Sequence, residues 1–267
     1  MWNRDKNKTK KDQPKTVDEI LEEQIAASLH EHKRSNVALL ISAFGGGMEV
    51  GFSIFLMGTI TTLFYSSLSS EALHVILSFC YSVGFIFVII GRSELFTEHT
   101  ALAVLPVLNR SVTVGSLFIL WGIVYLGNLL GGYVFGIIIT ELGDKLEIID
   151  HNSFIYLGKK MTGHSWSTIL FSGMMAGWLM GLLGWLVTSS QETISRIIVV
   201  ILVTTTIGFG GLHHCIVGSI EVFASLLTDG GATFNEYLKF QSASTLGNIV
   251  GGVVFVALLK FSHIRIN

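Results

Sequence analysis

The sequence has few charged residues. Aspartate, glutamate, lysine and arginine make up 13% of the chain, about half of what soluble domains usually carry. Hydrophobic residues make up 50%. Five runs have no charged residue and are long enough for a membrane-spanning helix of about 20 residues: 72–91, 111–140, 161–191, 197–220 and 240–259. This composition excludes a soluble globular enzyme. It also excludes an outer-membrane barrel, whose strands are about ten residues long.

Cysteine and proline are also scarce. Cys80 and Cys215 lie in apolar stretches without a CxxC motif, which argues against a disulfide framework or a zinc site. Pro14 and Pro106 are the only prolines, so the Asn-Pro-Ala filter of water channels is absent. The net charge of −2 offers no basic surface for nucleic acid. No nucleophile–base pair stands out, so we expect neither an enzyme nor a bound cofactor or metal.

The basic residues gather near the N-terminus. Eight of the 17 lysines and arginines lie in residues 1–34. Residues 1–16 read as a disordered segment, and the apolar spacing of residues 17–34 predicts an amphipathic helix on the membrane surface. We therefore expect an N-terminal cytoplasmic arm, residues 1–34, followed by a transmembrane domain, residues 35–267.

The apolar runs predict six spans and a topology. The spans are expected at 36–64, 72–92, 112–140, 166–188, 195–226 and 238–262. Arg110, Arg196 and Lys260 lie in turns or ends on the side of the basic arm, so the positive-inside rule places both termini in the cytoplasm. The protein is thus expected in the cell membrane, plasma or inner, as a multi-pass protein. The 141–165 loop, with Lys159 and Lys160, is the exception on the outer face.

A sequence repeat relates the two halves. LGNLLGGYVF begins at Leu126 and LGNIVGGVVF begins at Leu246, with seven of ten positions identical. Glycines four residues apart in spans one and four indicate close helix packing. Two copies of a three-helix unit must enter the membrane from opposite sides, because three is odd. This is the inverted repeat of many channels and transporters.

Spans two and five are both interrupted. Span two meets Gly91-Arg92-Ser93-Glu94, and span five meets Gly208-Phe209-Gly210-Gly211. The pattern predicts breaks near 92–97 and 208–213, because non-helical backbone at membrane depth occurs only where protein or a water-filled cavity surrounds it. Each restart exposes a positive helix N-terminus, which attracts anions.

These motifs resemble the formate/nitrite transporter family. Leu95-Phe96-Thr97, Gly211-Leu212-His213-His214 and the paired Gly-Asn-xx-Gly-Gly helices carry the resemblance over residues 36–262. LFTEHTALAVLPV and HCIVGSIEV are typical of a divergent bacterial branch. The resemblance implies an all-α, aquaporin-like fold with six transmembrane helices, of which helices two and five are broken. It also implies a homopentamer in the lipid bilayer that transports small monovalent anions or their conjugate weak acids.

The resemblance assigns roles to individual residues. His214 is similar to the family's central pore histidine, and Thr97 to the loop threonine that hydrogen-bonds near the pore. An apolar constriction is expected at Tyr81 and Phe85, and the opposite constriction at Ile207. Lys159 and Lys160 lie close to the position of an outer-vestibule lysine.

Three positions depart from the family pattern. Gly177 and Gly218 stand where asparagines are usual, and His213 replaces a glutamate. The missing amides predict wider, less polar vestibules and weak formate flux.

Carboxylates inside apolar runs leave two interpretations open. Glu49 either lines the pore, as costly intramembrane charges often do, or is satisfied within a helix contact. Glu221, two turns after His214, is expected to line the cytoplasmic vestibule or to lie at the membrane interface. Glu94, Glu98 and His99 are expected to stabilise the loop in span two rather than to touch solute.

The sequence therefore predicts a channel or carrier for a small monovalent anion or weak acid, with proton coupling through His214. Two alternatives stay open. One is a channel for a neutral small solute, and the other is a membrane sensor or scaffold that transports nothing.

Overall fold

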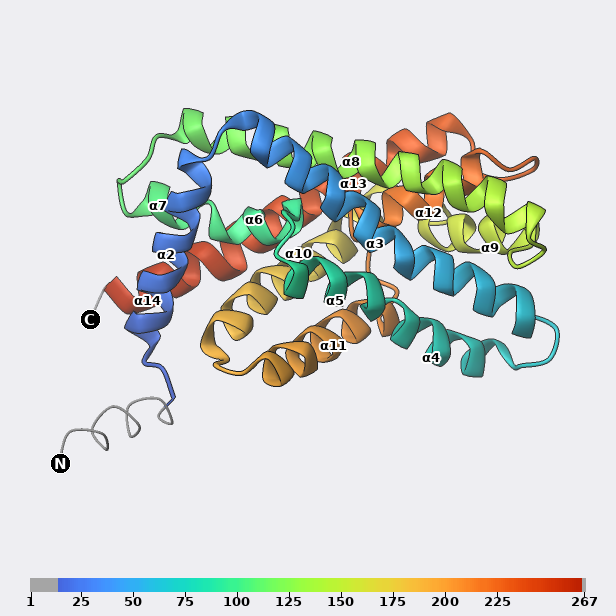
Figure 1. Ribbon diagram of the computed structural model, residues 1–267, viewed down its shortest axis with the longest axis horizontal. Helices are drawn as coiled ribbons and strands as arrows, with labels where there is room; N and C mark the ends of the chain where they lie inside the picture. Colours follow the sequence, from blue (N-terminus) through green and yellow to red (C-terminus); the bar gives the residue numbers. More distant parts are fainter. Residues whose placement is uncertain (1–13, 266–267) are drawn as a thin grey trace, which may run out of the picture.

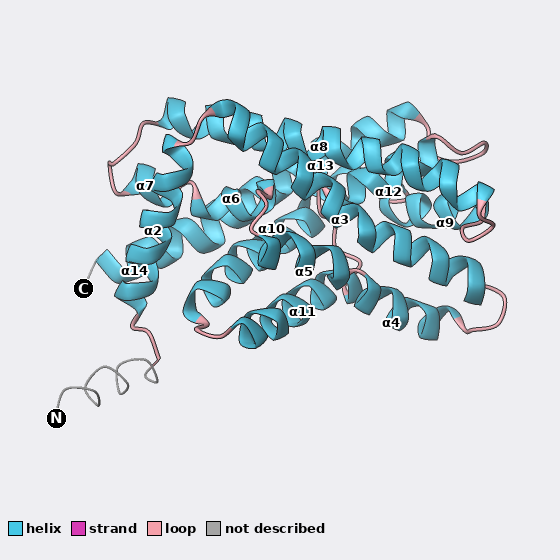
Figure 2. Cartoon of the chain, viewed as in Figure 1, coloured by secondary structure: helices cyan, strands magenta, loops and turns pink. Residues whose placement is uncertain are grey.

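The structure is a computed structural model that describes residues 14–265, and all regular structure in this range is helical (Figures 1 and 2). The helices are α2 (Val17–Lys33), α3 (Asn36–Phe64), α4 (Ser70–Cys80), α5 (Ser82–Gly91), α6 (Phe96–Leu102), α7 (Leu105–Leu108), α8 (Val114–Lys145), α9 (His151–Thr162), α10 (Trp166–Ser189), α11 (Thr193–Phe209), α12 (Val217–Leu226), α13 (Phe234–Gly252), the π-helical turn η1 (Val253–Leu258) and α14 (Leu259–Arg265).

Five helical segments are long and apolar enough to cross a membrane. They are α3, α4 with α5, α8, α10, and α13 with η1 and α14. The predicted span 195–226 is divided into two shorter apolar helices, α11 with 17 residues and α12 with 10. Large hydrophobic side chains such as Ile41, Phe118, Phe171 and Leu202 are exposed on these helices, as expected for surfaces that meet lipid or another subunit.

Both predicted interruptions are present. Helix α5 ends at Gly91, Arg92 has a left-handed φ of 61°, and α6 begins at Phe96. Helix α11 ends at Phe209, and the chain stays non-helical as far as Ile216, three residues beyond the predicted range.

Asn128 closes the first interruption. Its side-chain oxygen accepts a hydrogen bond from the Phe96 N–H at 2.8 Å, and its amide nitrogen donates to the carbonyls of Glu94 at 2.8 Å and Ala43 at 2.7 Å. One buried amide on α8 thus satisfies backbone groups that the break in the helix leaves unpaired.

Asn248 does the same at the second interruption. Its oxygen accepts from the Cys215 N–H at 2.9 Å, and its amide nitrogen donates to the carbonyls of His213 and Gly173, both at 2.9 Å. The contacts of Asn128 and Asn248 therefore match one for one. The two asparagines are the ones that the sequence repeat aligns.

Glycines bring the repeat helices into backbone contact. A Cβ atom at Gly47 of α3 would lie 2.1 Å from the Asn128 carbonyl oxygen on α8, and one at Gly177 of α10 would lie 2.2 Å from the Asn248 carbonyl oxygen on α13. The interpretation of Gly177 as a missing vestibule amide is therefore wrong. An asparagine has no room there, because the helix backbones touch.

Helix α2 forms at the predicted residues, but its apolar face has different neighbours from those predicted. The side chains of Ile20, Leu21 and Ile25 are buried, and α2 contacts α7 and α10. Lys15 Nζ donates to the Thr188 carbonyl at 2.7 Å. The apolar face thus packs against the protein, not against a membrane surface. The predicted disordered segment lies largely outside the described residues.

The 141–165 segment contains a helix that the sequence does not predict. Helix α9 lies at the end of the molecule opposite α2, where it packs on α12 (Figure 1). We call these two ends of the molecule the α2 end and the α9 end.

Candidate functional site

Thr97 and His214 meet at the two interruptions. Both side chains are buried, and the Thr97 Oγ1 lies 2.8 Å from the His214 Nε2. The His214 Nδ1 faces the backbone N–H groups of Ile216 at 3.3 Å and Val217 at 3.2 Å. Because these amides can only donate, Nδ1 must accept and Nε2 carries the hydrogen. His214 therefore donates to Thr97.

This pattern fixes the chemistry of the imidazole. A second proton would have to sit on Nδ1, where the N–H groups of Ile216 and Val217 already occupy the lone pair. Protonation would cost those hydrogen bonds and would leave two buried donors unpaired. His214 is thus arranged as a neutral hydrogen-bond donor.

Aromatic and aliphatic side chains cover His214 on one side. The Phe85 ring packs edge-on against His214 with centroids 5.2 Å apart, and Tyr81 packs on Phe85 at 5.2 Å. Ile207 lines the same cavity as Tyr81, so its predicted place at the opposite constriction is wrong. Helix α11 carries Ile207 into the Tyr81 cavity before the chain folds back to His214.

A small cavity lies at the α9 end. Its volume is about 40 Å³, and it is lined by Tyr81, Ile207, His74, Lys160 and Glu221, among others. We call it the α9-side cavity. Helices α4, α9, α11 and α12 and the junction of α4 with α5 supply these side chains, so the cavity lies where both halves of the sequence meet.

His74 positions Lys160 in this cavity. The Lys160 Nζ donates to the His74 Nδ1 at 3.2 Å, and the His74 Nε2 donates to the Phe209 carbonyl at 2.8 Å. Burial lowers the pKa of Lys160, and Glu221 partly opposes this by raising it. His74 was not predicted as a cavity residue, although it is a polar residue inside the charge-free run 72–91.

Lys159 and Glu221 line different hollows of the molecule. Lys159 is exposed and lines a separate groove with Tyr65 and Asp150, because its side chain lies on a different face of α9 from that of Lys160. Glu221 lies in the α9-side cavity, because α12 runs toward the α9 end after His214.

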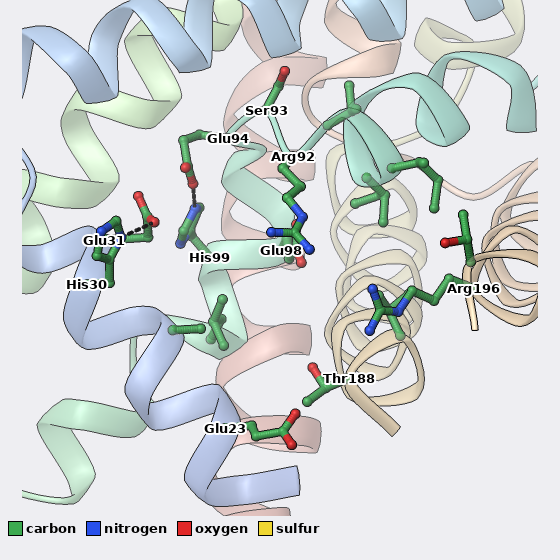
Figure 3. A pocket seen from close by; sticks show the side chains of 17 residues that line it. Glu23, His30, Glu31, Arg92, Ser93, Glu94, Glu98, His99, Thr188 and Arg196 are labelled. Atoms are coloured by element: carbon green, nitrogen blue, oxygen red, sulfur yellow. Dashed lines mark hydrogen bonds and ion pairs between the residues drawn. The ribbon is translucent and has the colours of Figure 1, made fainter. Parts of the chain in front are cut away.

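A larger cavity lies at the α2 end (Figure 3). We call it the α2-side cavity. Its volume is about 510 Å³, and charged side chains from α2, α6, α11 and the first interruption surround it. They are Glu23, His30, Glu31, Arg92, Glu94, Glu98, His99 and Arg196.

An ion-pair chain ties α2 to the first interruption. The Arg34 guanidinium donates to Glu31 and to Glu94, both at 2.6 Å. Glu94 also accepts from the His99 Nε2, and Figure 3 shows these two side chains pointing at one another. Glu94 and His99 therefore stabilise the loop as expected, and both also line the cavity. The role of α2 in enclosing this cavity was not predicted.

Several candidate residues lie away from both cavities. The His213 Nδ1 lies 2.8 Å from the Ser172 hydroxyl oxygen. A Cβ atom at Gly218 would lie 2.4 Å from the Phe240 ring, so Phe240 fills the space where a wider vestibule was expected. A carboxylate oxygen of Glu49 would lie 3.9 Å from a Cβ atom at Gly91. Within residues 14–265, His213, Gly218 and Glu49 line neither the α9-side nor the α2-side cavity.

The site thus has three layers. A cavity with Lys160 lies at the α9 end, an acidic and basic cavity lies at the α2 end, and the Thr97–His214 pair lies between them without lining either. Residues 14–265 contain no group of three or more His, Cys, Asp or Glu side chains that could hold a metal ion. The arrangement places a hydrogen-bonded pair at a buried centre, between two cavities that do not reach it.

Comparison with known proteins finds similarity to one family over nearly the whole chain. A model of the formate/nitrite transporter family matches residues 18–262. The inner membrane protein YfdC of Escherichia coli (strain K12) is 31% identical over 255 residues, which cover 90% of this chain and 79% of YfdC.

Solved structures share the fold. A protein described as an FNT family ion channel superposes with a TM-score of 0.81 at 22% identity, covering 91% of this chain and 98% of its own. A pentameric formate channel with formate bound superposes with a TM-score of 0.74 at 23% identity, covering 87% and 98%.

Proposed function

Because the chain belongs to the formate/nitrite transporter family, we propose that it conducts a small monovalent anion, or the neutral weak acid of that anion, across the cell membrane. The observation that carries this proposal is the Thr97–His214 pair, held at 2.8 Å between two polar cavities. Members of this family are channels and transporters rather than enzymes.

We further propose that six membrane crossings form two inverted three-helix units. The matching contacts of Asn128 and Asn248 support this, as do the close approaches at Gly47 and Gly177. Residues 35–267 would form the channel domain. Residues 1–34 would form the cytoplasmic arm, with both termini in the cytoplasm, so that the α9 end faces outward.

The permeation path follows from energetics. Placing a bare charge at the centre of a bilayer is costly. In the proposed path Lys160 draws the anion into the α9-side cavity, and Tyr81, Phe85 and Ile207 then force it to lose water. The Nε2–H of His214 and the hydroxyl of Thr97 replace part of the lost hydration.

The hydrogen-bond pattern of His214 changes the proposed route of the proton. Since the Nδ1 lone pair is occupied by two backbone N–H groups, His214 acts as a fixed donor and does not shuttle the proton. A proton that crosses then travels on the solute, as the neutral acid. Transport is still proton-coupled in this account, but His214 is not the titrating group.

We also propose that the protein works as a homopentamer in the lipid bilayer. The exposed apolar side chains along the long helices need such partners, and the solved formate channel of the same fold is described as pentameric.

The test is a flux panel in proteoliposomes at two pH values. Formate, nitrite and other small monovalent anions are compared with a neutral solute of similar size. The proposal predicts uptake that depends on the anion and rises when the outer pH is lowered. Swelling that ignores both anion and pH would identify a neutral-solute channel. Empty-liposome rates for every solute would contradict transport.

A further inference from the structure

The α2-side cavity contains two guanidinium groups that the proposed path does not use. Arg92 lies in the first interruption and Arg196 lies on α11, so each half of the sequence supplies one of them. Figure 3 shows both side chains extending into the cavity. Within residues 14–265 neither arginine forms an ion pair, and Arg196 donates through Nε to the Ser190 carbonyl at 3.2 Å. Most of their hydrogen-bond donors are therefore left for a ligand.

The carboxylates around the same cavity are largely occupied by other cations. Glu23 accepts from Lys15 at 2.6 Å, and Glu31 and Glu94 both accept from Arg34 at 2.6 Å. These ion pairs offset the negative charge of the α2 wall. The wall therefore does not cancel the two arginines that face it, and the cavity keeps a positive side.

The size and lining of the cavity indicate the class of ligand. Its volume of about 510 Å³ lies in the range of small-molecule sites, whereas an anion of three heavy atoms would fill only a small part of it. Ser93 and Thr193 add hydroxyl groups, and Ile89 and Val187 add apolar surface. In the described part of the chain, Glu98 also lines the cavity without an ion pair, so it can accept from a hydroxyl group.

A phosphate group fits these donors. The planar fork of a guanidinium binds two phosphate oxygens at once, and two such forks can share the oxygens of one phosphate. Ser93 and Thr193 can donate to the remaining oxygens. A monovalent anion such as formate has one charge and two oxygens, so it cannot engage both arginines in this way.

We propose that the α2-side cavity is a binding site for a phosphate group, held between Arg92 and Arg196. This inference goes beyond the proposed function and does not depend on it, because the ligand binds and is not transported. The phosphate belongs either to a soluble phosphate ester or to a lipid headgroup. Both sources present the same chemistry to the two arginines, and the test separates them.

The chain offers matched variants. Arg92→Gln and Arg196→Gln each remove one guanidinium group and leave a polar side chain. Arg110 is the control, because it is exposed, lies in the turn between α7 and α8, and has a left-handed φ of 58°, close to the 61° of Arg92. Helix α2 contacts α7, so Arg110 lies at the same end of the molecule, but it does not line the cavity.

The measurement uses the full chain in a maltoside detergent, which contains no phosphate. Calorimetric titration with glycerol 3-phosphate tests the soluble source, and native mass spectrometry with phosphatidylglycerol tests the lipid source. We expect the wild type to bind one of these probes. Arg92→Gln and Arg196→Gln should each weaken that binding about tenfold, because each loses a charge-assisted contact. Arg110→Gln should stay within twofold of the wild type, and an equal concentration of formate should not displace the probe.

Binding of neither probe to the wild type would overturn the inference. An equal loss of binding in Arg110→Gln would also overturn it, because net charge alone would then explain the effect. Displacement by formate would assign the arginines to the transported anion instead. Binding of glycerol 3-phosphate alone would identify a soluble ester as the source, and binding of phosphatidylglycerol alone would identify a lipid headgroup. Size-exclusion profiles of all variants are the folding control.

Discussion

At the scale of single residues, few polar groups meet the proposed path between the two cavities. His214 has one N–H group, which donates to the Thr97 hydroxyl, and both side chains are buried. Phe85 packs against the imidazole. In such surroundings each hydrogen bond to a dehydrated solute has a large effect, because no water replaces it.

Thr97→Val should slow flux about tenfold, because one lost hydrogen bond is worth about 1 kcal/mol or somewhat more. Initial uptake rates in proteoliposomes measure this. Thr206→Val is the matched control, because the Thr206 hydroxyl bonds its own helix at the Leu202 carbonyl, on an exposed face. Equal rates for Thr97→Val and the wild type would remove Thr97 from the path.

Lys160 predicts a pH dependence at the α9 end. Burial lowers its pKa, so Lys160 loses its charge at a lower pH than an exposed lysine does. Flux of nitrate, which stays ionised throughout, should therefore fall as the pH rises through this lowered pKa.

Lys160→Arg should remove this alkaline fall, because a guanidinium stays charged. Nitrate uptake across an alkaline pH series checks this in the wild type and in Lys160→Arg. A fall that persists in Lys160→Arg would show that another group titrates.

At the scale of helices, close packing at glycine is the feature most open to test. Gly177→Ala should lower the melting temperature clearly, because its Cβ would lie 2.2 Å from the Asn248 carbonyl oxygen. The helix backbones would have to separate, and overpacking of this kind costs about 1–3 kcal/mol. Thermal unfolding in detergent measures the effect.

Gly45→Ala is the control, since nothing lies within 4 Å of its Cβ position. If Gly177→Ala and Gly45→Ala have the same melting temperature, α10 and α13 are not in backbone contact at Gly177.

Periodicity and repeats predicted the elements well where the signal is local. The long apolar runs gave helices, and the glycine and polar clusters after Gly91 and Ile207 gave the interruptions. The packing of α2 was not predictable, because an amphipathic face looks the same whether it meets a membrane or a protein. Helix α9 was missed because its short sequence is mixed in polarity.

The meeting of Thr97 with His214 could be expected from the two interruptions. Thr97 and His214 each lie beside a break, and the structure brings them together. Gly177 and Gly218 were misread, because a sequence does not reveal that the Asn248 backbone and the Phe240 ring fill the neighbouring space. His74 was not predicted, because its contacts with Lys160 and Phe209 join helices that lie far apart in the sequence.

At the scale of the whole molecule, two half-structures close on one buried centre. Asn128 and Asn248 fix the two interruptions in matching ways, and the cavities at the two ends stop short of His214. The central claim is that a solute crosses at this centre by accepting a hydrogen bond from a neutral His214.

The most direct test is anion flux at two pH values in proteoliposomes containing the wild type, His214→Phe, His214→Asn or His213→Gln, with size-exclusion profiles as the folding control. The account predicts that His214→Phe loses flux at both pH values. His214→Asn should keep reduced flux with the pH dependence of the wild type, because an amide still donates and His214 does not titrate. His213→Gln should be mild. Wild-type flux in His214→Phe, or a greater loss in His213→Gln than in His214→Phe, would contradict the account.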